Sequence, residues 1–279
     1  MKSCTMVNYG DWRQVMLINE TIYILGVRVD NLTLNQAVRR IRGYIDTSNK
    51  RKGARKVFFA NVHSIHLARK NPDLYRNILN ADLVLPDGSG LDIAGRLLNE
   101  PVKENLNGTD FIPVIFRAAE RLGYSVYLLG AKPGTVDNCT DNLRIQFPNL
   151  EIAGSHHGYI DENLENKIIA DINRKRPDIL LVGMGSPLQE KWVTCNAPSL
   201  NVGVCFAVGG LFDFLSGEIE RAPLWMRKTG MEWVHRFAQN PRDKWNRIFV
   251  EIPLFLFLIL TRCAFHSNFY QLQNARKLK

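Results

Sequence analysis

An aspartate in a Pro/Gly turn is the residue of this sequence best placed for acid–base chemistry. Leu85 ends an apolar run and is followed at once by Pro86-Asp87-Gly88-Ser89-Gly90. A carboxylate that projects from a strand end into a cleft can take the proton of an attacking hydroxyl group. Pro-Asp-Gly is also favoured turn chemistry, so the pattern alone leaves open both a general base and a plain turn.

Two further turns place backbone amides at the start of a helix. Gly108-Thr109-Asp110 precedes an apolar helical pattern, and Gly130-Ala131-Lys132-Pro133-Gly134 opens a helix that runs to about Phe147. Helix N-termini bind phosphate, and Lys132 would add positive charge toward a diphosphate. Neither turn is a Walker A sequence and Gly-rich turns are common in α/β folds, so each signal alone is weak.

A fourth turn, Gly183-Met184-Gly185-Ser186-Pro187, ends an apolar strand. It lacks the third glycine of GxGxxG, which disfavours a Rossmann dinucleotide site and hence an oxidoreductase. Gln189 and Glu190 follow in the first helical turn. They are candidates for the cleft, with ordinary polar residues at a helix start as the alternative.

Metal ligation and cofactor binding are not expected. The six histidines form no HExxH or HxxxH pattern, and no Asp-x-Asp occurs. Chemistry on a phosphorylated substrate would then use cationic side chains and helix dipoles to stabilise a leaving group. The five cysteines are scattered without CxxC spacing, which predicts reduced thiols in a cytosolic compartment.

The elements that must position these residues alternate along the chain. Short apolar runs precede helical patterns at 57–62, 83–85, 125–130, 179–183 and 202–208. This alternation predicts an α/β fold, a Rossmann-like, largely parallel sheet flanked by helices with a cleft at the carboxyl ends of its strands. Thr21–Leu25 predicts an earlier strand, and Thr33 with Gln36 predicts a capping box for a helix to about Ile45.

The composition changes after Glu220, which predicts a catalytic domain at 1–220 and a helical C-terminal appendage at 221–279. Seven of the chain's 36 basic residues but only two acidic ones lie in 221–247, together with three of the five tryptophans; the formal net charge of the whole chain is +9. Basic side chains beside aromatic rings are typical of segments that bind an anionic membrane surface. The apolar run at 252–260 is too short to span a bilayer.

Other interpretations of this segment stay open. The aromatic residues could be the core of an ordinary helix pair with the bases as a solvated face. Aromatic and basic side chains also bind nucleic acid, although we expect no nucleic acid here. A non-catalytic membrane adaptor would bind lipid and transfer no sugar.

Taken in order, the motifs resemble the WecG/TagA/CpsF family of glycosyltransferases. The resemblance spans roughly Ile22 to Pro253 and rests on these elements: Asn61, Leu85-Pro86-Asp87-Gly88, Gly108-x-Asp110, Leu129-Gly130-Ala131, Gly183-x-Gly185-x-Pro187-x-Gln189-Glu190-x-Trp192, Gly209-Gly210-x-Phe212-Asp213-Phe214-x-x-Gly217 and Arg221-Ala222-Pro223. One motif would mean little, but their shared order and spacing are specific.

The resemblance implies a metal-independent, inverting enzyme. Such an enzyme moves a sugar from a UDP-sugar to an undecaprenyl-diphosphate-linked glycan, in exopolysaccharide or capsule synthesis, as a peripheral protein on the cytoplasmic face of the bacterial inner membrane. By motif match, Asp87 is similar to the catalytic base and Gln189 to a residue near the transferred sugar. The other positions expected to bind substrate in such an enzyme are Gly130, Ala131, Phe212 and Asp213 around UDP, Arg221, Arg227 and Arg236 at the diphosphate, and Asn61, Asn105, Gly108, Asp110, Lys132, Gly185, Pro187 and Glu190 elsewhere in the cleft.

Two departures from the family pattern concern the donor sugar. Many relatives have Thr where this chain has Phe59, and Arg where it has Asn105. The lost hydroxyl and the lost cation favour a neutral hexose such as glucose. The alternative is an N-acetylmannosamine or N-acetylmannosaminuronic acid donor, of the teichoic acid or common antigen type. The sequence leaves the oligomeric state open, a homo-oligomer included.

Overall fold

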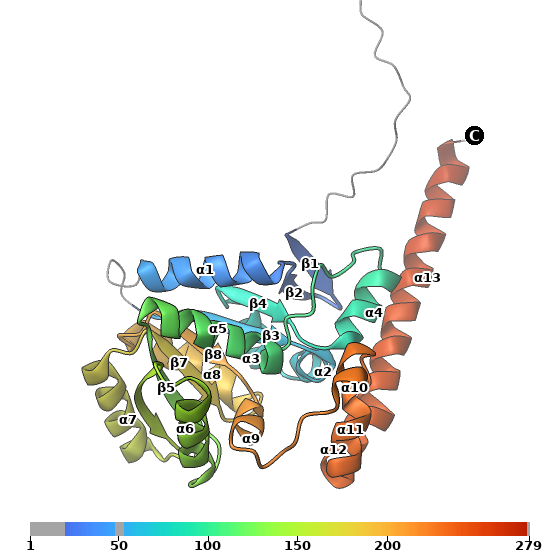
Figure 1. Ribbon diagram of the computed structural model, residues 1–279. Helices are drawn as coiled ribbons and strands as arrows, with labels where there is room; N and C mark the ends of the chain where they lie inside the picture. Colours follow the sequence, from blue (N-terminus) through green and yellow to red (C-terminus); the bar gives the residue numbers. More distant parts are fainter. Residues whose placement is uncertain (1–19, 48–52, 278–279) are drawn as a thin grey trace, which may run out of the picture.

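The computed structural model describes residues 20–47 and 53–277; in these ranges the side chains of Lys228, Arg236, Asp243, Lys244 and 265–277 are not described. The chain forms an α/β fold in which a parallel sheet is flanked by helices and a helical segment stands at one end (Figure 1). The elements are β1 (Thr21–Ile24), β2 (Val27–Asp30), α1 (Leu34–Asp46), β3 (Arg55–Ala60), α2 (Val62–Lys70), α3 (Pro72–Leu79), β4 (Leu83–Pro86), α4 (Ser89–Leu97), α5 (Gly108–Leu122), β5 (Ser125–Gly130), α6 (Thr135–Gln146), β6 (Glu151–His156), α7 (Glu162–Lys175), β7 (Ile179–Gly183), α8 (Leu188–Asn196), η2 (Ala197–Ser199), β8 (Val204–Ala207), α9 (Leu211–Leu215), α10 (Leu224–Lys228), α11 (Glu232–Gln239), α12 (Pro241–Asn246), η3 (Arg247–Glu251) and α13 (Ile252–Lys277).

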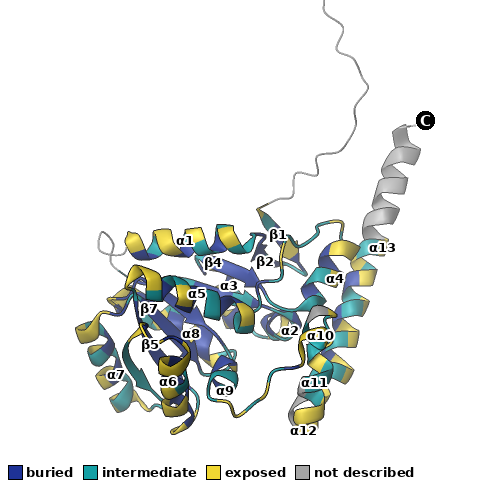
Figure 2. Cartoon of the chain, viewed as in Figure 1, coloured by how far each residue is buried: buried dark blue, intermediate teal, exposed yellow. Residues whose placement is uncertain are grey.

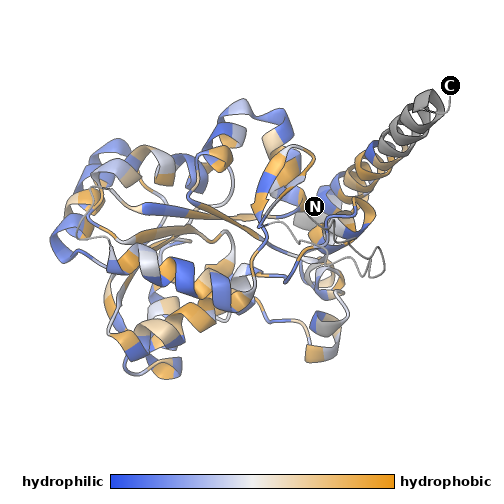
Figure 3. Cartoon of the chain, turned by 90° about the horizontal axis from the view of Figure 1, so that it is seen from above, coloured by the Kyte–Doolittle hydropathy of each residue, from blue (hydrophilic) through white to orange (hydrophobic). Residues whose placement is uncertain are grey.

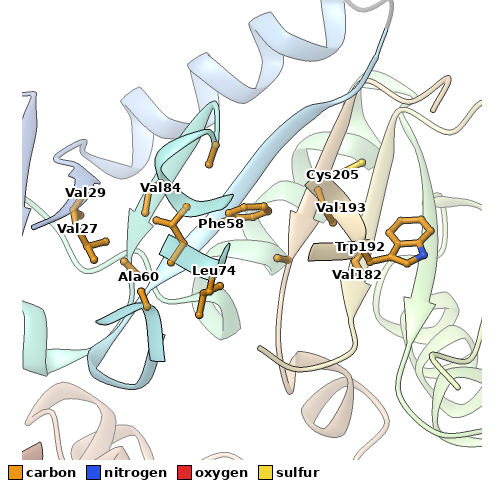
Figure 4. Packing of buried hydrophobic residues seen from close by; sticks show 14 of the residues in the cluster. Val27, Val29, Phe58, Ala60, Leu74, Val84, Val182, Trp192, Val193 and Cys205 are labelled. Carbon is orange, nitrogen blue, oxygen red and sulfur yellow. The ribbon is translucent and has the colours of Figure 1, made fainter. Parts of the chain in front are cut away.

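The main sheet has six strands in the order β4-β3-β8-β7-β5-β6, and neighbouring strands are parallel. Successive side chains of its central strands enter two different buried clusters, as Val57 and Phe58 do. Helices α1, α5, α6 and α9 cover one face, while α2, α3, α7 and α8 cover the other. Both faces of the sheet are therefore buried (Figure 2), which is why the strands are continuous apolar runs. Figure 4 shows the packing on the face that carries Phe58 and Val182.

Five predicted strands of the main sheet are confirmed as β3, β4, β5, β7 and β8, and the Thr33–Gln36 capping box begins α1 as expected. The predicted strand at Thr21 is β1, which pairs with β2 in a hairpin apart from the main sheet. Strands β2 and β6 were not anticipated. At the sheet edge β6 is partly exposed and has no apolar run, so its sequence gives little strand signal.

The C-terminal segment packs against the rest of the fold through α13, which contacts α4 and α2. Phe255 and Ile259 of α13 are 3% and 0% exposed and belong to the same buried cluster as Phe58. The predicted division at Glu220 stays a prediction. Figure 3 shows hydrophobic residues recurring along α13, yet among the described residues no helix is long and apolar enough to cross a membrane.

Candidate active site

Asn61 and Asp87 lie side by side, because they directly follow the paired strands β3 and β4, whose last residues are in register. The backbone amide of Asp87 donates to the carbonyl of Ala60 at 2.8 Å. The Asn61 side chain caps α2, its Oδ1 accepting from the amide of Ser64, while its Nδ2 donates to Asp87 Oδ2 at 2.9 Å. The cap therefore fixes the amide that orients the carboxylate.

The turn after Asp87 requires a glycine. Gly88 has φ +97°, a conformation that favours glycine, and its amide donates to Asn105 Oδ1 at 2.9 Å. The Pro-Asp-Gly sequence thus ends β4 abruptly and begins α4. Asn105 braces this turn from the following loop.

Asp87 lies between two cavities. The central cavity, of about 340 Å³, is lined by Asn61, Asp87, Gly108, Gly185, Gln189, Glu190 and Asp213 among others. The apolar cavity, of about 370 Å³, is lined by Ile93, Trp233, Ile248, Ile252 and Leu256, together with Asn61, Asp87, Asn105, Asp110 and Arg227. Asp87 therefore lines both the central cavity and the apolar cavity.

A third cavity extends the central one along α8. This lateral cavity, of about 820 Å³, is lined by Ala131, Lys132, Trp192, Phe212 and Asp213, and shares Gly185, Gly209, Gly210 and Asp213 with the central cavity. Gly130 lies where β5 approaches β7, and a Cβ there would stand 2.3 Å from the carbonyl oxygen of Gly183. Only glycine fits, and the turn then presents Ala131 and Lys132 to the cavity.

Gln189 and Glu190 are both 4% exposed and form a connected network at the start of α8. The amide of Gly209 donates to Gln189 Oε1 at 2.9 Å, and Gln189 Nε2 donates to Glu190 Oε1 at 2.8 Å. Ser186 Oγ donates to Glu190 Oε2 at 3.0 Å. The predicted site residue Pro187 precedes this helix and follows a cis peptide bond. The network fixes both side chains against the central cavity.

Asp110 ties the first turn of α5 to the C-terminal segment. Arg221 Nη1 donates to Asp110 Oδ1 at 2.9 Å, and Arg227 Nη1 donates to the same oxygen at 3.4 Å. Burial alone would raise the pKa of Asp110, but hydrogen bonds from Arg221 and Asn107 and the charges of both arginines lower it. The two predicted diphosphate-binding arginines thus have protein partners here. The predicted Arg236 lies on α11, and its side chain is outside the described residues.

A family model of the WecG/TagA/CpsF glycosyltransferases matches residues 22–268, nearly the whole described chain. The chain belongs to this family. It is 31% identical over 204 residues to the N-acetylglucosaminyldiphosphoundecaprenol N-acetyl-beta-D-mannosaminyltransferase of Bacillus subtilis strain 168, covering 73% of this chain and 78% of the relative. A protein of the same description from Staphylococcus aureus strain MW2 is 30% identical over 250 residues, or 85% of this chain and 91% of the relative.

In this glycosyltransferase the structure adds residues that sequence reasoning did not place at the site. His63 and Ser64 line the central cavity, and Arg247 lines both the central and the apolar cavity. Phe59, which the sequence already associated with the donor sugar, also lines the central cavity. In the sequence, His63 is one of six histidines without a metal-binding pattern, and Arg247 is one of the seven basic residues in 221–247. The available signal for His63 was its place in the first turn of α2, directly after the end of β3.

The buried carboxyl group of Glu190 gives the site a testable pH dependence. Burial raises its pKa above the ordinary 4.5, against the hydrogen bonds from Gln189 and Ser186. The native state therefore binds this proton more tightly than the unfolded state does. The stability that it contributes is fully present below the ordinary pKa and is lost as the pH rises through the raised value.

Glu190→Gln should remove this dependence, because an amide can keep both side-chain contacts without a buried charge. We expect the melting temperature of the variant to exceed that of the wild type at about pH 8, and the difference to shrink toward about pH 4. Thermal unfolding across this range measures it, with exposed Glu162→Gln on α7 as the control. A melting-temperature difference between Glu190→Gln and the wild type that stays constant with pH would contradict a raised pKa of Glu190.

Proposed function

We propose that the protein transfers a sugar from a UDP-sugar to an undecaprenyl-diphosphate-linked glycan, with inversion and without a metal ion. The observation that carries this is the position of Asp87 between a polar and an apolar cavity. The central and lateral cavities suit the nucleotide-sugar. The apolar cavity suits the acceptor, whose sugar must meet Asp87 while its first isoprene units lie against Trp233, Ile252 and Leu256.

The reaction is a single displacement. Asp87 takes the proton of the acceptor hydroxyl, whose oxygen bonds to the anomeric carbon from the face opposite UDP. The bond between that carbon and the diphosphate oxygen breaks, UDP leaves, and the configuration inverts. Asn61 holds the carboxylate in place through its 2.9 Å hydrogen bond. Lys132 lies beside the lateral cavity and Arg247 beside the central one, where each adds positive charge for the departing diphosphate.

A neutral hexose such as glucose is the donor we favour, and Phe59 supports it. Its ring lines the central cavity and lies over Gly108. It packs edge-on against Phe111, with 6.3 Å between the two ring centroids. We expect this ring to occupy space that an N-acetyl substituent on the donor sugar would need. UDP-N-acetylmannosamine is the second candidate, since the named relatives are N-acetylmannosaminyltransferases.

We place the enzyme on the cytoplasmic face of the bacterial inner membrane, in exopolysaccharide or capsule synthesis. A polyprenyl-linked acceptor resides in the bilayer, so the enzyme must work at its surface. Large hydrophobic side chains are exposed on the C-terminal segment, for example Trp225 at 60% and Phe257 at 61%. Such a surface beside basic residues supports peripheral attachment.

The direct test is a set of UDP-sugars incubated with undecaprenyl-diphosphate-linked mono- and disaccharides, with released UDP and product mass as readouts. UDP-glucose should give product and UDP together. If only UDP-N-acetylmannosamine gives product, the donor is UDP-N-acetylmannosamine and not UDP-glucose. UDP release without a glycolipid product, or no reaction with any pair, would contradict the proposed transfer.

Phe59→Thr tests the donor assignment, because it removes the ring and introduces a hydroxyl group. We expect the ratio of kcat/KM for UDP-N-acetylmannosamine to that for UDP-glucose to rise by about tenfold or more. Phe59→Leu, which removes the ring without adding a hydroxyl, separates space from hydrogen bonding. Unfolding curves must accompany both, since a large-to-small change beside Phe111 costs about 2–5 kcal/mol. An unchanged ratio in a folded variant would contradict the role of Phe59.

A further inference from the structure

A hydrogen-bonded pair of side chains joins the active-site cleft to the C-terminal segment, residues 221–277. His63 Nδ1 donates to Glu251 Oε2 at 2.7 Å, across 188 positions of sequence. His63 stands in the first turn of α2, two residues after the Asn61 cap, and lines the central cavity. Glu251 ends η3 and its side chain is 11% exposed. The pair thus connects the helix whose cap orients Asp87 with the segment that reaches over the site.

The pair also answers an electrostatic problem. The site must receive a diphosphate, yet it contains the carboxyl groups of Asp87 and Glu190, and Glu251 lies near by. A largely buried carboxylate without a partner is strongly destabilising. His63 faces Glu251 through its ring and also lowers the pKa of Glu190, in part offsetting the larger effect of burial. The imidazole therefore gives the largely buried carboxyl group of Glu251 a hydrogen-bond partner at 2.7 Å.

Arg247 lies at the other end of η3 from Glu251. This single π-helical turn runs from Arg247 to Glu251, and the amide of Ile252 closes it on the carbonyl of Arg247. Isolated π-helical turns are frequent at functional sites. Arg247 lines both the central and the apolar cavity. A fixed Glu251 therefore fixes how η3 is oriented toward the cleft and how far it enters the cleft. The position of the Arg247 guanidinium follows from this.

The pair is not needed simply to attach α13. Phe255 and Ile259, one and two turns further on, are almost completely buried in the main hydrophobic cluster. They anchor the helix at a distance from the cleft, whereas His63 and Glu251 lie at its cleft end. The hydrogen bond between His63 and Glu251 adds a fixed position for η3 at the cleft.

We propose that His63 and Glu251 are positioning residues that hold Arg247 at the junction of the two cavities, where its guanidinium meets the diphosphate of the donor. This inference rests on the proposed function. His63 acts through Glu251 and Arg247 and takes no part in proton transfer. The consequence is that loss of His63 and loss of Arg247 remove the same interaction.

A double-mutant cycle tests the proposal with UDP affinity and kcat/KM as readouts. We expect Arg247→Ala and His63→Ala each to weaken UDP binding and kcat/KM by about tenfold or more, and the double variant to be no worse than about twofold below Arg247→Ala. Glu251→Ala should match His63→Ala, whereas Glu251→Gln, which can still accept from the ring, should recover most of the loss. His66→Ala, one turn along α2, is the matched control and should resemble the wild type.

Three outcomes would overturn the proposal. They are normal UDP binding by His63→Ala, losses that multiply when His63→Ala and Arg247→Ala are combined, and an equal loss in His66→Ala. Melting temperatures identify a variant that simply fails to fold, and the Glu251→Gln recovery then decides. Failure of the proposed function looks different, because the wild-type chain itself would then neither bind UDP nor transfer a sugar.

Discussion

Replacing Asp87 by Asn is expected to slow sugar transfer by about 10²–10⁴-fold, the usual contribution of a general base. An amide has the same shape, and its oxygen can still accept the hydrogen bond from Asn61 Nδ2, so the turn should keep its structure. The change removes only the ability to take a proton. UDP affinity should therefore stay within about twofold of the wild type while kcat falls, which separates chemistry from binding.

Asp92→Asn is the matched control for this experiment. Asp92 stands one turn further along, in the first turn of α4, and is partly buried like Asp87. Steady-state kinetics with saturating donor and calorimetric titration with UDP supply the two readouts. Turnover of Asp87→Asn within about threefold of the wild type would exclude Asp87 as the base. Equal losses in both variants would point to a structural effect on α4.

The second large effect is expected at the membrane. Ten of the eighteen large hydrophobic side chains exposed among the described residues lie between 224 and 260. Replacing Leu224, Trp225 and Phe257 by Ser should lower partitioning onto anionic vesicles by about 100-fold or more, since fully burying each such side chain contributes about 1.5–3 kcal/mol. Transfer to a vesicle-embedded acceptor should fall with it, while UDP binding should not.

The control for this triple variant is an equally apolar set from elsewhere on the surface. Leu79, Leu122 and Ile145 are also exposed, at 36%, 40% and 76%, and their replacement by Ser should leave vesicle binding unchanged. Sedimentation with vesicles of stated anionic lipid content measures both. If the two triple variants sediment alike, the C-terminal segment is not the membrane contact.

Much of the fold follows from the sequence because two-sided burial leaves a strong pattern. The central strands β5, β7 and β8 are apolar throughout, and each is followed by a turn and a helix. The edge strand β6 is not predicted from the sequence, because Glu151, Gly154 and Ser155 need not be apolar at a half-exposed edge of the sheet. The hairpin strand β2 is not predicted from the sequence either, because it is only four residues long and follows β1 after a tight turn.

The candidate site is predictable to the extent that its residues follow strands. Asp87, Ala131 and Gln189 each come after a parallel strand, so the sheet brings their segments to one edge. Pairings across long sequence separations have no such signal. Asp110 was expected to contact substrate, but its arginine partners lie 111 and 117 positions away. His63 and Glu251 are separated by 188 positions, and neither residue alone indicates the other.

The order of the strands also bears on how the chain reaches its native state during synthesis. The last strand, β8, lies in the middle of the sheet between β3 and β7, so its insertion joins two halves made much earlier. The hydrophobic cluster then remains incomplete until Phe255 and Ile259 have been added. Because contacts between distant segments form slowly, folding should be completed only after the ribosome has released the chain as far as Ile259. A prematurely terminated chain that contains every strand would still expose apolar surface, and would be a substrate for chaperones and proteases.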